Sequence, residues 1–74
     1  MVSVKVCWRQ TGKPADGKKV ALGFDGLTRG VTRDEYTNFS GEAHFDADPG
    51  QGMVYVSGQT VYTGALQGMV AVYI

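Results

Sequence analysis

Cysteine and histidine are scarce in this sequence, which has one residue of each, Cys7 and His44, among its 74 residues. A lone cysteine cannot form a disulfide within the chain, and no Cys/His cluster offers a structural metal site, so we expect no metal and no cofactor. A domain of this size buries only about 60% of the surface that its unfolded chain exposes, and it often depends on a disulfide, a metal or a partner chain. Of these three sources of stability, only association with another chain is compatible with the sequence.

Neither sign of charge is in excess, because seven Lys and Arg residues balance seven Asp and Glu residues. Nucleic-acid binding normally requires a basic surface that neutralises phosphates, so we expect no nucleic-acid partner. No stretch reaches the roughly 18 apolar residues of a membrane-spanning helix, and the first residues lack the charged start and apolar run of a secretion signal. The sequence therefore predicts a cytoplasmic protein that does not bind membranes.

Stretches that favour a helix are also missing. Eleven glycines are spread along the chain, and each would destabilise a helix interior by about 1 kcal/mol relative to alanine. Only residues 1–11 and 31–40 form glycine-free windows of ten or more residues. The first window alternates apolar and polar residues, and the second is rich in Thr, Asn and aromatic residues, which favour helix poorly. We expect a fold without a full helix.

The sequence does contain short alternating segments separated by turn residues. These segments lie at 2–9, 19–24, 42–46, 52–57, 60–63 and 69–74, with a weaker candidate between 30 and 37. The dipeptides Asp16-Gly17, Pro49-Gly50 and Ser57-Gly58 are typical of the turns between strands. We predict a single all-β domain over residues 1–74, a small β-sandwich or barrel of about seven short, mainly antiparallel strands.

Cys7 is predicted to lie on the outer face of the first strand. Strict alternation puts Val6 and Trp8 on the core side and leaves the thiol exposed between Lys5 and Arg9. Because neighbouring positive charge makes a thiol more reactive, one hypothesis is a nucleophile, a redox sensor or a ligand for a metalloid. The alternative is a small residue at a packed or interfacial position.

His44 is predicted to point outward between Glu42 and Asp46, while Ala43 and Phe45 point to the core. Flanking acids can orient a histidine as a general base or join it as metal ligands, and the alternative is a solvated strand face. The chain has no glycine-rich phosphate loop and no serine in a nucleophile elbow, so we expect no enzymatic activity.

Two predicted strands, at 53–56 and 69–74, carry no charge on either face. Strands of this kind are typically covered on both sides, which a small sandwich cannot achieve alone. If the valines fill the core, the outward residues form an apolar face rich in Met and Tyr, and both residue types are enriched at protein interfaces. The predicted interface residues are Met53, Tyr55, Tyr62, Met69, Ala71 and Tyr73.

The first functional hypothesis is therefore a non-catalytic interaction or structural module, which forms a homo-oligomer or binds a protein partner through this face. The alternative is a protein that binds a small ligand or metalloid through Cys7, with His44 as a second candidate ligand-binding residue.

The order of turns and strands also resembles a known family. Residues 12–22 (GKPADGKKVAL), 37–45 (TNFSGEAHF) and 52–58 (GMVYVSG) are similar to the carboxypeptidase regulatory-like and transthyretin-like β-sandwich domains. The resemblance implies a Greek-key sandwich that serves as a non-catalytic accessory or adhesion module. A hydrolase branch of the transthyretin-like group has two histidines, an arginine and a C-terminal Tyr-Arg-Gly-Ser. This chain has one histidine and ends in Val72-Tyr73-Ile74, so the resemblance does not extend to that activity.

Overall fold

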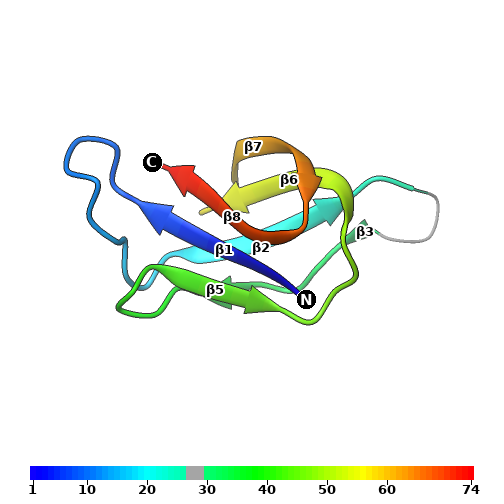
Figure 1. The fold of residues 1–74 in the computed structure, drawn as a ribbon, viewed down its shortest axis with the longest axis horizontal. Helices are drawn as coiled ribbons and strands as arrows, with labels where there is room; N and C mark the ends of the chain where they lie inside the picture. The colour runs from blue at the N-terminus through cyan, green and yellow to red at the C-terminus, as the bar shows by residue number, and fades with distance from the viewer. Residues whose placement is uncertain (27–29) are drawn as a thin grey trace.

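The computed structural model describes residues 1–26 and 30–74 (Figure 1). Within these ranges the chain forms strands and no helix, which confirms the predicted all-β class. The strands of the described residues are β1 (Val2–Cys7), β2 (Lys19–Phe24), β3 (Gly30–Val31), β4 (Glu35–Tyr36), β5 (Glu42–Phe45), β6 (Gly50–Val56), β7 (Gln59–Leu66) and β8 (Gly68–Tyr73). The strand candidate between 30 and 37 is present as two very short strands, so residues 1–26 and 30–74 form eight strands rather than about seven.

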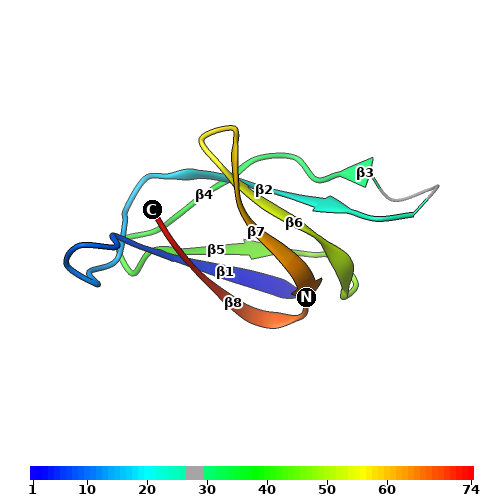
Figure 2. The same ribbon diagram turned by 90° about the horizontal axis from the view of Figure 1, so that it is seen from above.

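The strands form two sheets. In the three-stranded sheet the order is β5-β1-β8, with β1 antiparallel to β5 and parallel to β8. In the five-stranded sheet the order is β3-β2-β6-β7, β4 also pairs with β2, and every pairing is antiparallel. Figure 2 shows β1, β5 and β8 on one side and β2, β3 and β4 on the other. Mainly antiparallel pairing is thus confirmed, and β1 with β8 is the parallel exception.

Valine and leucine side chains fill the space between the sheets. Alternation in β1 directs Val2, Val4 and Val6 inward, where all three are fully buried. Ala43 and Phe45 of β5 are also buried, as their positions predict. The largest fully buried side chains are Leu22, Leu66, Val2, Val4, Val6, Val20 and Val54. Because the inner faces of both sheets pack in this shared core, the side chains between them along each strand form the two outer faces of the molecule.

A tight turn joins β6 to β7. Ser57 and Gly58 both have positive φ values, 52° and 83°, as a two-residue hairpin turn requires when its twist matches that of the strands. The turn predicted at Ser57-Gly58 is confirmed. At its other end β7 finishes in the fully buried Leu66, and the chain then enters β8 in the opposite sheet.

The predicted alternation is wrong where β1 ends. Cys7 is buried, with 8% of its surface exposed, and Trp8 is 42% exposed, the reverse of the expectation. Cys7 pairs with Tyr73 on one side and forms a bridge with Pro14 on the other, so backbone lies along both of its sides. Trp8 has left the strand, and its N–H donates to the Lys13 carbonyl at 2.9 Å. Alternation applies only while the chain stays extended, so it no longer sets the direction of Trp8, which follows the end of β1 at Cys7.

Candidate functional site

An apolar stripe runs along β8 on the outer face of the three-stranded sheet. Val70 and Val72 point into the core, and the residues between and beside them point outward. Met69 and Tyr73 are each 51% exposed, and Ala71 between them is exposed as well. We call Met69, Ala71 and Tyr73 the β8 stripe. Their outward direction agrees with the sequence pattern, and their role as an interface stays a prediction.

β8 is also an edge strand, because among the described residues the order β5-β1-β8 leaves one of its sides without a neighbouring strand in the sheet. The Ile74 N–H donates to the Cys7 carbonyl at 3.0 Å, and the Ile74 carbonyl accepts from the Arg9 N–H at 2.8 Å. Successive residues of a strand direct their backbone groups to opposite edges. The N–H and C=O groups of the β8 stripe therefore point away from β1, toward the open edge.

The other predicted interface residues do not join this surface. Met53 and Tyr55 lie on β6 in the five-stranded sheet, and both are half-buried. The Tyr55 ring lies across Gly23 so closely that a Cβ on Gly23 would be 2.8 Å from it. Tyr62 packs against the core, and its hydroxyl donates to the Ala65 carbonyl at 3.1 Å. The prediction that all six residues share one face is wrong, because β6 and β8 belong to different sheets and Tyr62 packs on the core.

Polar side chains occupy the other half of the same outer face. His44 points outward as predicted, and its Nδ1 lies 2.7 Å from the Ser3 Oγ. Its Nε2 lies 3.6 Å from a Glu42 carboxylate oxygen. The sequence identified Glu42 beside His44 but missed Ser3, which is 41 residues away along the chain. Only the pairing of β1 with β5, with Ser3 directly opposite His44, brings the serine to the histidine.

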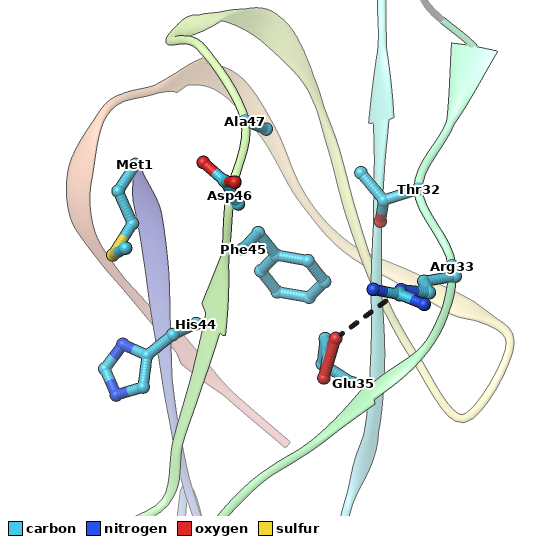
Figure 3. A pocket seen from close by; sticks show the side chains of 8 residues that line it. All are labelled: Met1, Thr32, Arg33, Glu35, His44, Phe45, Asp46 and Ala47. Atoms are coloured by element: carbon cyan, nitrogen blue, oxygen red, sulfur yellow. Dashed lines mark ion pairs between the residues drawn. The ribbon is translucent and has the colours of Figure 1, made fainter.

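A cavity of about 290 Å³ lies along β5 (Figure 3). It is lined by Met1, Thr32, Arg33, Glu35, His44, Phe45, Asp46 and Ala47. Figure 3 shows the Phe45 ring directed toward Arg33 and Glu35, which form an ion pair at 3.9 Å, and the His44 ring on the far side of β5, turned away from them. The ionisable groups of the lining therefore do not converge on one point.

Cys7 and His44 are not brought together. Cys7 is the last residue of β1, whereas His44 lies opposite Ser3 near the beginning of that strand. Within residues 1–26 and 30–74, no three His, Cys, Asp or Glu side chains are grouped so that they could hold a metal ion. The prediction that the Cys7 thiol is exposed, as a ligand site would require, is wrong, since Cys7 is buried.

Comparisons with protein-family models, with curated proteins and with solved structures find no match for this chain. In the part of the chain that the structure describes, no helix is long and apolar enough to cross a membrane. The site is therefore interpreted from its own residues: an open, uncharged edge strand beside a Ser3, His44 and Glu42 cluster.

Proposed function

We propose that the chain is an interaction module that associates with a second copy of itself through β8. The observation that carries this proposal is the combination, in one strand, of an open hydrogen-bonding edge and exposed apolar side chains. Proteins that stay monomeric usually protect such an edge with charged residues, proline or a bulge. β8 has the sequence GMVAVY, with neither charge nor proline.

A two-fold axis at Ala71 would make β8 complementary to itself. In an antiparallel pair of β8 strands centred there, Met69 of each copy lies opposite Tyr73 of the other, and Ala71 lies opposite Ala71. Contacts between a thioether and an aromatic ring are favourable, and the small alanine allows close approach at the axis. The same patch then serves both copies, as a two-fold dimer requires.

The backbone agrees with this register. In an antiparallel pair, directly opposite residues either exchange both of their N–H···O=C bonds or exchange none. The residues that would exchange them are Met69, Ala71 and Tyr73, and these are the residues whose N–H and C=O groups point to the open edge. Pairing would join the two three-stranded sheets into one continuous sheet without breaking the pairing of β8 with β1.

A second copy is a better occupant than a charged partner, because β8 offers no charge of either sign. A partner with a strongly acidic or basic surface would lose hydration there without gaining an ion pair. The resemblance to non-catalytic accessory domains favours the same kind of role.

The test is sedimentation across a range of protein concentration, comparing the unchanged protein with Ala71→Pro. Proline at 71 removes an N–H that points to the open edge, so the bond pattern between β8 and β1 is retained, and edge strands tolerate proline. We expect a dimer for the unchanged protein and a monomer for Ala71→Pro. Ala71→Lys should act in the same way, since it places two like charges at the axis.

The matched control is Tyr36→Lys, which places a lysine at an exposed tyrosine of the five-stranded sheet. This variant should remain a dimer. A monomer at every concentration, or a dimer that Ala71→Pro and Ala71→Lys leave intact, would contradict the proposal. A stable complex with a different protein through β8 would contradict the choice of a second copy.

A further inference from the structure

The outer face of the three-stranded sheet also holds a hydroxyl, an imidazole and a carboxylate in a row. The Ser3 Oγ lies 2.7 Å from the His44 Nδ1, and the His44 Nε2 lies 3.6 Å from the Glu42 Oε1. Each ring nitrogen thus has a different neighbour. Ser3 and Glu42 are partly exposed and His44 is exposed, so small molecules in solution can reach this row.

The positions of the two neighbours favour one tautomer of the neutral imidazole, with its proton on Nε2. The Glu42 Oε1 lies beyond hydrogen-bond distance of the Nε2, but the negative charge of a carboxylate at 3.6 Å favours a proton on that nitrogen. The Nδ1 then keeps its lone pair and accepts the hydrogen bond from the Ser3 hydroxyl. The order of hydroxyl, imidazole and carboxylate is that of serine hydrolases, with the two ring nitrogens exchanged and with an ion-pair distance in place of the hydrogen bond between imidazole and carboxylate.

We propose that Ser3 is a nucleophile toward small carboxylic esters, with His44 as its general base and Glu42 as the residue that positions His44. The Ser3 Oγ forms a bond to the acyl carbon, its proton passes to the His44 Nδ1, and the bond from the acyl carbon to the leaving oxygen breaks. The leaving group departs with the electron pair. Protonated His44 faces the Glu42 carboxylate, and its added proton then returns to solvent.

The same step with water in place of Ser3 completes the cycle. Water attacks the acyl carbon of acyl-Ser3, a proton passes to His44, and Ser3 leaves as the hydroxyl with a proton from His44. Acetate and the unmodified protein are the products when the ester is an acetate.

The surroundings of Ser3 define the class of ester. Ser3 lies opposite His44 on one side and Met69 on the other, so an apolar thioether stands next to the hydroxyl. The outer face of a sheet has no deep walls, which favours short acyl groups with a good leaving group over peptides. p-Nitrophenyl acetate has these properties, and its reaction releases a coloured product.

The test combines the rate of p-nitrophenolate release with mass mapping of the acetylated peptide. We expect acetyl on Ser3 in the unchanged protein, and release that is roughly tenfold slower in Ser3→Ala and in His44→Gln. All the substituted side chains are at least partly exposed, and circular dichroism checks that the variants fold. For the positioning residue, Glu42→Gln should slow release several-fold and Glu42→Asp should restore part of the rate, which a purely structural role for Glu42 would not produce.

The matched control is Ser40→Ala, which removes another partly exposed serine and should leave the rate unchanged. Mass mapping separates Ser3 from the amines of lysine and of the N-terminus, which also react with activated esters. Acetyl found only on amines, or a Ser3→Ala variant that reacts as fast as the unchanged protein, would overturn the proposal. Acetylation of Ser3 that forms as fast in His44→Gln as in the unchanged protein would overturn the assignment of His44 as the base.

Discussion

Thr37 shows at the scale of a residue how this small protein ties its loops to its core. It is the one polar residue buried in the described part of the chain, with 4% of its surface exposed. Its hydroxyl donates to the Ala15 carbonyl at 2.7 Å and accepts from the Lys18 N–H at 2.8 Å. Two connections that are distant in sequence are therefore joined by one side chain, a role that the sequence pattern did not predict.

Thr37→Val should lower the free energy of unfolding by about 2 kcal/mol, because it keeps the shape of the side chain and leaves buried backbone groups without hydrogen bonds. Urea denaturation measures the change. Thr63→Val on the exposed side of β7 is the matched control and should change stability by less than about 0.5 kcal/mol. Equal effects at the two positions would contradict the role given to Thr37.

The burial of Cys7 leads to a second prediction at this scale. Its thiol should react with a disulfide reagent at least about tenfold more slowly in the folded protein than in urea, since reaction requires local opening. The control is Cys7→Ser combined with Thr63→Cys, in which the thiol is exposed and should react rapidly without urea. A fast reaction of native Cys7 would show that the thiol is accessible after all.

At the scale of an element, β6 and β8 share an uncharged sequence pattern but differ in environment. β6 lies between β2 and β7, and the Tyr55 side chain on its outer face covers Gly23. β8 has one neighbour, β1, and its outward Met69 and Tyr73 stay half exposed. The pattern predicted two strands that need cover. The pattern could not show that β6 is a central strand whose outer face is partly covered by its own Tyr55 side chain, because the position of a strand depends on which strands pair.

The β6–β7 hairpin gives a prediction for an element. Ser57 has a φ of 52°, a conformation that asparagine adopts more readily than serine, and Asn-Gly is a preferred pair for this turn. Ser57→Asn should raise the free energy of unfolding by about 0.5 kcal/mol, measured by urea denaturation. Ser57→Val should lower it, because a β-branched residue is strained at positive φ. A stabilising valine would contradict the geometry of the turn.

At the scale of the whole molecule, two small sheets share one core, and the open edge of the three-stranded sheet is where further pairing can occur. If the folded chain dimerises through β8, association stabilises the folded state by mass action. The midpoint of thermal unfolding should then rise with protein concentration. A gain of about 1 kcal/mol corresponds to about 4–8 °C in a domain of this size.

Thermal unfolding followed by circular dichroism across about a hundredfold range of concentration measures this effect. The Ala71→Lys variant should show no dependence on concentration, because it cannot form the dimer. A midpoint that is constant in the unchanged protein would contradict self-association at the concentrations used.

Features that depend only on neighbouring residues could be predicted without the structure. Alternation with a period of two placed Val2, Val4 and Val6 in the core and Met69 and Tyr73 outside, and the dipeptide Ser57-Gly58 marked a tight turn. Turn conformation and strand alternation are local properties, so the residues beside each position specify them.

Other features follow from the pairing of segments that are distant in the sequence. The parallel pairing of β1 with β8 makes β8 an edge, the pairing of β1 with β5 brings Ser3 to His44, and the end of β1 buries Cys7 instead of Trp8. Register and edge position follow from which strands close the common core with the least exposed apolar surface. That is a property of the whole chain, which no short stretch of its sequence contains.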